Sequence, residues 1–155
     1  MTLGSRTRPP ELPAPSPSAT PRPVLLATFN VPVDPAAAEF AVEAALEAGQ
    51  PLVVVNLIGG AFYPSVAAPA PVAVVTPNVE ESLRAPAQLA ASLGIRSERL
   101  RVLTPRPIEA LVELVTDREP GLLVLGSDPA RLRRRFWAKA RKRVRERTTC
   151  LIWPA

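Results

Sequence analysis

Short apolar runs alternate along this chain with longer segments of helical periodicity, and this alternation constrains the fold more than any other feature. Residues 24–29 (VLLATF) and 51–57 (PLVVVNL) carry no charge, as expected for strands that are covered on both faces. Between them, residues 34–49 place small apolar side chains at helical spacing, begin with Asp-Pro and end with glycine. A strand, a helix and a strand in this order predict a parallel pair with a right-handed crossover.

The same alternation continues to the end of the chain. Further helices are expected over residues 78–93, from residue 107 onward and over residues 128–146, with further strands over residues 99–104, 121–126 and 149–153. Pro86 should kink the second helix or shift its start. Residues 59–77, which are punctuated by glycine and proline, are interpreted as a long loop with room for an extra strand turn. The order predicts an α/β fold, with a five-stranded parallel doubly wound sheet and helices on both faces.

The amino-terminal segment has a different composition from the rest. Residues 1–22 are rich in proline and poor in large apolar side chains, so burial cannot offset their ordering entropy. We expect a disordered proline-rich tail there, with a docking peptide as the alternative, and one domain over residues 23–155. The segment has no signal-peptide pattern, and no apolar run approaches the ~20 residues of a membrane span. A cytoplasmic location without membrane contact is therefore predicted.

The residue types that usually perform catalysis are scarce. The chain has no histidine, and Cys150 is its only cysteine, so an intramolecular disulfide is excluded. Neither a GxSxG nor a GxxxxGK[ST] pattern occurs. We expect no enzyme and no metal site, and the alternative is a weak nucleotide hydrolase or an adenylylating relative.

Basic residues are concentrated in one segment. Residues 131–147 hold ten Lys/Arg and one acid, for a formal charge of +9, so the rest of the chain carries −4 within a total of +5. An apolar stripe steps by four along this helix, at Leu132, Phe136, Ala140 and Val144. Trp137 lies at the edge of that stripe, where sheet-edge or dimer packing is favoured over a stacking role. Since Arg131 to Arg135 are placed in the first turns, they oppose the helix dipole.

This basic helix allows two interpretations. In the favoured one it is a solvated face, neutralised in part by acids on other helices or on a partner subunit, such as Glu39, Glu43, Glu47, Glu109, Glu113 and Asp117. In the other it is an anion-binding stripe for nucleic acid, a nucleotide or an acidic protein. The candidate residues for that stripe are Arg131, Arg133, Arg134, Arg135, Lys139 and Arg141.

Three stretches together resemble the universal stress protein family, and the resemblance covers residues 23–155. Residues 22–30 (RPVLLATFN) look like the family's opening strand, and residues 104–128 look like its third helix and fourth strand, ending in Gly-Ser. Residues 143–155 (RVRERTTCLIWPA) look like its last helical turn and final strand. The resemblance implies an adenine nucleotide alpha hydrolase-like fold and a homodimer formed through the final strand. The dimer residues would be Cys150, Leu151, Ile152 and Trp153.

Many members of that family bind ATP through Gly, two residues, Gly, nine residues, Gly, and then Ser or Thr. Each glycine lets the backbone approach phosphate, and the hydroxyl donates to a phosphate oxygen. Here those positions hold Gly126, Pro129, Lys139 and Ala140, so only the first of the four matches. The Asp that ends the opening strand of ATP-binding members is also missing, since Phe29 and Asn30 stand there.

These departures predict that ATP is not bound in the family manner and that no cofactor is held. The favoured hypothesis is therefore a stress-response or regulatory binding protein that works as a homodimer, with an unknown regulatory protein as a possible partner. One alternative is an ATP or adenine-nucleotide switch with a pocket at the strand ends. Its candidate residues would be Thr28, Asn30, Asn56, Gly126 and Ser127. The other alternative is an anion- or nucleic-acid-binding module built on the basic helix.

Overall fold

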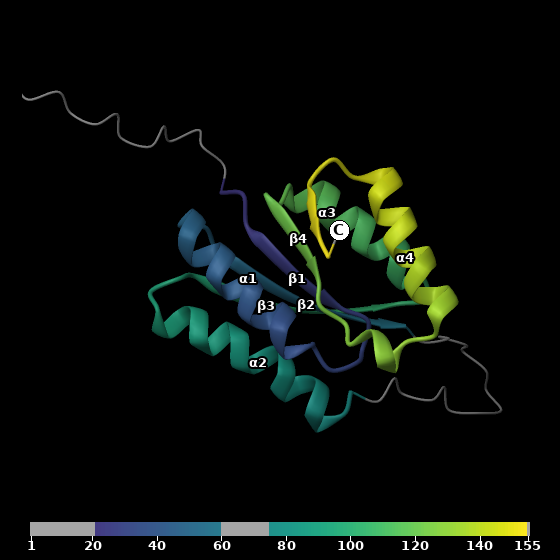
Figure 1. The fold of residues 1–155 in the computed structure, drawn as a ribbon, viewed down its shortest axis with the longest axis horizontal. Helices are drawn as coiled ribbons and strands as arrows, with labels where there is room; N and C mark the ends of the chain where they lie inside the picture. The colour runs from purple at the N-terminus through teal and green to yellow at the C-terminus, as the bar shows by residue number, and fades with distance from the viewer. Residues whose placement is uncertain (1–20, 60–74, 155) are drawn as a thin grey trace, which may run out of the picture.

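The computed structural model of the protein describes residues 21–59 and 75–154 (Figure 1). The elements follow the order β1 (Val24–Thr28), α1 (Pro35–Ala48), β2 (Leu52–Gly59), α2 (Pro77–Ser92), β3 (Ser97–Thr104), α3 (Pro107–Arg118), β4 (Leu122–Leu125), a 3-10 turn (Pro129–Arg131), α4 (Arg134–Arg147) and β5 (Leu151–Trp153). The strands form one parallel sheet of five in the order β3-β2-β1-β4-β5. The predicted five-stranded parallel doubly wound sheet is confirmed.

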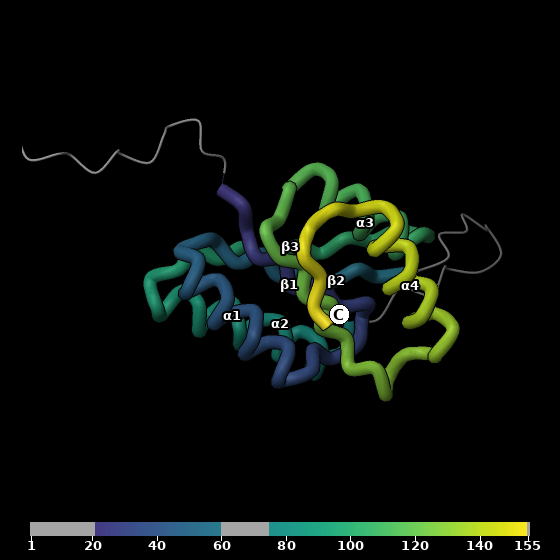
Figure 2. The backbone as a smooth tube through the Cα atoms, turned by 45° about the horizontal axis from the view of Figure 1, so that its top comes forward, coloured from purple at the N-terminus to yellow at the C-terminus, as the bar shows by residue number. Residues whose placement is uncertain are grey.

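Two apolar cores lie on the two faces of the sheet. Helices α1 and α2 cover one face, and α3 and α4 cover the other (Figures 1 and 2). Side chains of the central strand β1 alternate between them, because Val24 and Leu26 enter the first core while Leu25 and Ala27 enter the second. Every residue of β1 is buried, which explains why its sequence carries no polar face.

Helix α3 buries its predicted stripe, and α1 ends at its predicted glycine, although Leu46 of α1 is 49% exposed. The expected stripe of α3 is confirmed, since Ile108, Leu111, Val112 and Val115 are all buried. Gly49 ends α1 with φ +63°, a conformation that glycine adopts without strain.

Asp34 departs from its expected role at the start of α1. It occupies the N-cap position, yet its side chain makes no cap hydrogen bond. Its backbone N–H instead donates to the carbonyl oxygen of Gly126 at 2.8 Å. The start of α1 is therefore tied to the chain that follows β4.

Helix α2 runs through Pro86 without moving its start. It begins at Pro77, after Thr76, whose Oγ1 accepts a hydrogen bond from the Val79 N–H. Pro86 has no N–H to donate to the carbonyl of Ser82 one turn earlier, and its ring is buried. Of the two expected effects of Pro86, a kink or a shifted start, the shift does not occur, because α2 begins at Pro77.

The last helix begins later than the sequence indicated. Asp128 and Pro129 start only the 3-10 turn, in which the Asp128 side chain accepts a hydrogen bond from the Ala130 N–H at 3.0 Å. Leu132 is extended, and α4 starts at Arg134. The expectation of a continuous helix from residue 128 was therefore wrong. The Asp128 side chain caps a single 3-10 turn, and the extended Leu132 separates that turn from α4.

The predicted proline-rich tail and the predicted long loop lie mostly outside the residues that the structure describes. The disordered tail is predicted for residues that lie mostly in the segment 1–20, and the long loop lies mostly in the segment 60–74. Neither segment is among the described residues. The described chain on either side shows β2 ending at Gly59 and α2 beginning at Pro77.

Candidate functional site

The strand order reverses between β1 and β4, and this point is where doubly wound sheets bind ligands. From β1 the chain moves outward to β2, whereas β4 lies on the other side of β1 and leads to β5. In such sheets the crevice lies beyond the carboxyl ends of the strands on either side of the reversal. The five predicted pocket residues gather around these ends, because Thr28 ends β1 and Asn30 follows it, Asn56 pairs with Thr28 from β2, and Gly126 and Ser127 follow β4.

Ser127 and Thr28 are bonded to each other and to the backbone. The Phe29 N–H donates to Ser127 Oγ at 3.0 Å, and Thr28 Oγ1 donates to the Val31 carbonyl at 2.6 Å. The two hydroxyl oxygens lie 3.1 Å apart. Because the Thr28 hydrogen is directed at Val31, the Ser127 hydroxyl must be the donor between them. Thr28 is 0% and Ser127 is 2% exposed, so neither hydroxyl faces solvent.

Asn56 and Asn30 form a second pair beside these hydroxyls. Asn56 Oδ1 accepts a hydrogen bond from the Asn30 N–H at 2.9 Å, and Asn56 Nδ2 donates to Asn30 Oδ1 at 3.3 Å. Asn30 has φ +53°, a left-handed conformation that asparagine tolerates better than most residues. We call Thr28, Asn30, Asn56 and Ser127 the polar layer. Its side chains hold the turn after β1 in place.

The backbone after β4 is also hydrogen-bonded to β1 and to the turn that follows it. The Gly126 N–H donates to the Ala27 carbonyl at 2.8 Å, and the Asp128 N–H donates to the Pro32 carbonyl at 3.2 Å. A Cβ added to Gly126 would lie 2.6 Å from Leu26 Cδ1 and 3.2 Å from Val33 Cγ1. Gly126 is therefore required by packing within the chain, whatever else binds nearby.

The other positions of the family's phosphate pattern lie apart from this layer. Pro129 belongs to the 3-10 turn, whereas Lys139 and Ala140 lie in the middle of α4. Lys139 is exposed and Ala140 is fully buried. Because both are inside the helix, their backbone N–H groups are engaged in helical hydrogen bonds.

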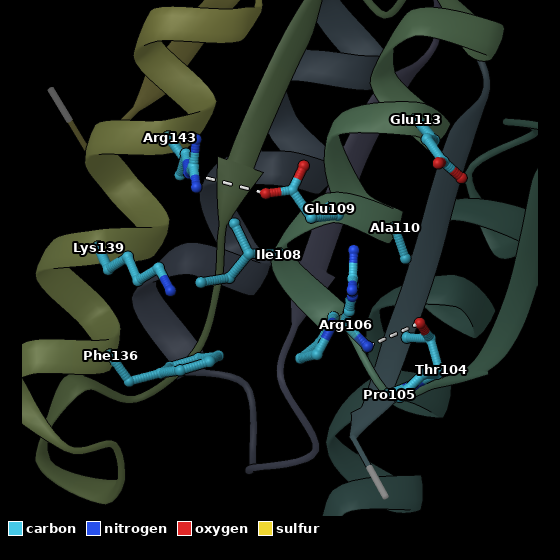
Figure 3. Close-up of a pocket in the computed structure, with 11 residues that line it drawn as sticks. Thr104, Pro105, Arg106, Ile108, Glu109, Ala110, Glu113, Phe136, Lys139 and Arg143 are labelled. Carbon is cyan, nitrogen blue, oxygen red and sulfur yellow. Dashed lines mark hydrogen bonds and ion pairs between the residues drawn. The ribbon is translucent and has the colours of Figure 1, made fainter. Parts of the chain in front are cut away.

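A groove of about 680 Å³ separates α3 from α4 (Figure 3). Its lining combines three cations, two acids and apolar side chains, and consists of Thr104, Pro105, Arg106, Pro107, Ile108, Glu109, Ala110, Glu113, Phe136, Lys139 and Arg143. Arg143 Nε lies 3.6 Å from Glu109 Oε1, which ties the two helices together. The Lys139 ammonium extends from α4 into the same space, as Figure 3 shows. The sequence did not reveal this groove, since its two walls are distant in the chain.

Some cations of the basic segment have partners. Arg131 lies 3.9 Å from Asp128, Lys142 lies 3.9 Å from Glu146, and Arg143 pairs with Glu109. Among the acids proposed to neutralise α4, only Glu109 forms an ion pair with it in the described chain. The three α1 glutamates lie on the helix that covers the opposite face of the sheet (Figure 1). Of the predicted neutralising contacts, the described chain therefore shows the one between Glu109 and Arg143.

Six further cations of this segment form no ion pair in the part of the chain that the structure describes. Within the described residues, no ion pair is formed by Arg133, Arg134, Arg135, Lys139, Arg145 and Arg147. The start of α4 also has no capping side chain and no acid in its first turn. Only Arg134 and Arg135 of the predicted first-turn arginines lie within the helix, and they oppose its dipole.

Strand β5 forms one edge of the sheet. Leu151 is 74% exposed, whereas Cys150 and Ile152 are partly covered by the core beneath α4. Trp153 stacks on Phe40 of α1 with ring centroids 4.8 Å apart. Of the four predicted dimer residues, Leu151 therefore presents the most open apolar surface.

The described chain holds neither a membrane-spanning helix nor a cluster of metal-ligating side chains. No helix in residues 21–59 and 75–154 is long and apolar enough to cross a membrane. In the same ranges, no three His, Cys, Asp or Glu side chains gather where they would hold a metal ion.

The sheet order and the crossovers define a doubly wound α/β domain with its reversal between the first and fourth strands. A family model described as the universal stress protein family matches residues 21–152. This chain therefore belongs to the universal stress protein family. A comparison with curated protein sequences finds no match.

Solved structures of the same family share this fold. A universal stress protein in complex with cAMP is 20% identical, with 86% of this chain and 95% of that chain covered at a TM-score of 0.55. The universal stress protein from Archaeoglobus fulgidus in complex with dAMP is 19% identical, with 86% and 96% covered at 0.58. A family protein from Burkholderia pseudomallei is 18% identical, with 90% and 100% covered at 0.57.

Proposed function

We propose that this universal stress protein is a regulatory binding protein without catalytic activity, and that it does not hold ATP in the manner of the family's ATP-binding members. One observation carries the proposal: the polar groups at the strand ends are hydrogen-bonded to one another. The hydroxyls of Thr28 and Ser127 and the amide of Asn56 are buried and paired. A phosphate or ribose would have to displace these bonds, leaving buried polar groups without partners.

The backbone supports the same proposal. ATP-binding loops offer free N–H groups and a close approach to phosphate. Here the N–H groups of Phe29, Asn30, Asp34 and Asp128 already donate within the chain. Pro129 has no N–H, and the positions of the third glycine and the hydroxyl lie within α4. The lack of histidine supports a role without catalysis.

Isothermal titration with ATP and Mg²⁺ tests this proposal. The expected result is no saturable heat at the strand-end site at millimolar ATP. Ser127→Gly serves as the comparison variant, since it removes the Ser127 hydroxyl from the strand ends and would weaken a nucleotide bound there. Saturable heat at low micromolar ATP with the natural chain, lost in Ser127→Gly, would contradict the proposal.

An adenine-nucleotide switch is the second candidate. It is favoured by two similar structures that hold cAMP and dAMP, and by the reversal of strand order beside β1. Titration with AMP and cAMP distinguishes this candidate from the first. Saturable binding of either, with the same stoichiometry as the subunit, would favour the switch.

We also propose a homodimer formed through β5. The edge strand presents the exposed Leu151 beside free backbone groups, and an exposed apolar edge is stabilised by pairing with a second copy. Light scattering after gel filtration should give twice the mass of the subunit at micromolar concentration. Leu151→Lys should give the subunit mass, whereas Leu93→Lys, an exposed leucine after α2, should leave the dimer intact. A monomer before any substitution would refute the dimer.

A further inference from the structure

We propose that the outer face of α4 binds the phosphate backbone of nucleic acid, independently of base sequence. The proposal goes beyond the regulatory role above and does not depend on whether the strand-end site binds ATP. It rests on four exposed cations on one helix, three of which form no ion pair within the described residues. We call Arg134, Arg135, Lys142 and Arg145, with Ala138 between them, the outer face.

Helical geometry places these residues together. Ala140 and Val144 are fully buried and define the inward side of α4. At 100° per residue, Ala138 lies opposite them, and the four cations flank it. All five residues are exposed. The small Ala138 side chain leaves space for a phosphate strand to approach between longer cationic side chains.

The charge of this face is poorly compensated by the rest of the molecule. Lys142 is the only one of its four cations with an ion pair, and its partner Glu146 lies 3.9 Å away on the same helix. Other acids that lie near α4, Glu109 and Glu113 in the groove and Asp128 before the helix, are on its inner side or at its start. The segment 60–74 contains no Asp or Glu in its sequence.

The chemistry of the face favours phosphate. Three of its four cations are arginines, and the planar guanidinium matches phosphate oxygens with two parallel hydrogen bonds. Arginines at the start of α4 oppose the helix dipole, so a bound phosphate would relieve an unfavourable arrangement there. Since α4 contains no Asn or Gln, it lacks the side chains that usually read adenine, and contacts should be to the backbone.

Other polyanionic partners fit the face less well. A protein partner is usually held by a buried aromatic or apolar anchor, and the outer face offers only Ala138. An anionic membrane is usually bound by an amphipathic helix that inserts its apolar side, and that side of α4 is packed against the sheet. A nucleic acid needs neither, because phosphate contacts alone supply its non-specific affinity.

Fluorescence anisotropy with short labelled DNA duplexes and RNA hairpins tests the proposal across salt. We expect binding at about 50 mM salt that weakens steeply towards about 200 mM, as counterion release requires. The triple variant Arg134→Gln/Arg135→Gln/Arg145→Gln should reduce the slope of log K against log salt by about 2.7 for duplex DNA, since each phosphate contact contributes about 0.9. Its affinity at low salt should fall at least about tenfold.

The matched control is Arg84→Gln/Arg96→Gln/Arg99→Gln, which removes the same charge from α2, the connection after it and β3 at the other edge of the sheet. It should keep the natural slope, and circular dichroism should show both triple variants folded. Equal loss of binding in the two variants would overturn the proposal, because net charge alone would then explain it. Tighter binding of polyglutamate or of phosphatidylserine vesicles than of nucleic acid would overturn it too, as would no binding at low salt.

Discussion

The polar layer and the outer face of α4 differ in whether their polar groups have partners within the described chain. In the polar layer, the buried hydroxyls of Thr28 and Ser127 and the amide of Asn56 all have partners within the chain. On the outer face, Arg134, Arg135 and Arg145 are exposed and form no ion pair within the described residues. A buried group without a partner is costly, whereas an exposed charge is solvated by water. The polar groups at the strand ends are therefore satisfied within the chain, whereas these arginines are accessible to solvent.

The largest expected effect is a loss of stability when Gly126, beside the polar layer, is substituted. The Gly126→Ala variant places a Cβ 2.6 Å from the fully buried Leu26 side chain, and should lower the free energy of unfolding by about 3 kcal/mol. Urea unfolding measures this loss. Gly121→Ala is the matched control, because its Cβ would meet Arg22 at an ordinary 3.6 Å. An unchanged stability in Gly126→Ala would mean that this glycine is not required by packing.

A smaller loss is expected when the hydroxyl of the polar layer is removed. Ser127→Ala leaves the buried Phe29 N–H without its acceptor and should cost about 2 kcal/mol of unfolding free energy. The exposed Ser92 hydroxyl donates to the Leu89 carbonyl, so Ser92→Ala should change stability by less than about 0.5 kcal/mol. Equal effects of the two variants would show that the polar layer is not a buried network.

On the outer face of α4, by contrast, substitutions in the first turn should raise the free energy of unfolding. Replacing Arg134 and Arg135 with Glu puts acids in the first turn of α4 and should raise the free energy of unfolding by about 1 kcal/mol at low salt. Arg145→Glu, in the last turn, should instead lower it. Thermal unfolding at two salt concentrations measures both, and the differences should shrink at high salt. Stabilisation by all three substitutions alike would indicate crowding of positive charge and no effect of the dipole.

The smallest effect concerns an exposed cation that does have a partner. Arg118 donates to both carboxylate oxygens of Glu98, at 2.9 and 3.1 Å, and these hydrogen bonds raise the pKa of the Arg118 guanidinium. Both side chains are partly exposed, so Glu98→Gln should cost only about 0.5 kcal/mol of unfolding free energy. Urea unfolding measures it. A loss as large as that of Ser127→Ala would contradict the contrast between buried and exposed polar groups.

The sequence predicted the fold well because periodicity reports burial. Uncharged strands and the stripe on α3 indicated which faces are covered, and the parallel order placed Thr28, Asn56 and Ser127 at one edge. The sequence did not show that these side chains bond to one another, since that depends on the turn at Asn30 with φ +53°.

The start of α4 and its ion pairs were harder to predict. Asp128-Pro129 has the composition of a helix start, yet the Asp128 bond to the Ala130 N–H caps only a 3-10 turn. Which cations find partners depends on the distance between helices, as Arg143 and Glu109 show across the groove. Such distances come from tertiary packing, which a local pattern does not specify.

The most direct test of the closed strand-end site is a titration of the isotopically labelled protein with ATP and Mg²⁺, followed by backbone amide NMR spectra. We expect no saturable shift for the amides of Phe29, Asn30 and Asp128, whose hydrogen bonds stay within the chain. Saturable shifts of these amides at micromolar ATP would contradict it, because they would show that the nucleotide enters the polar layer.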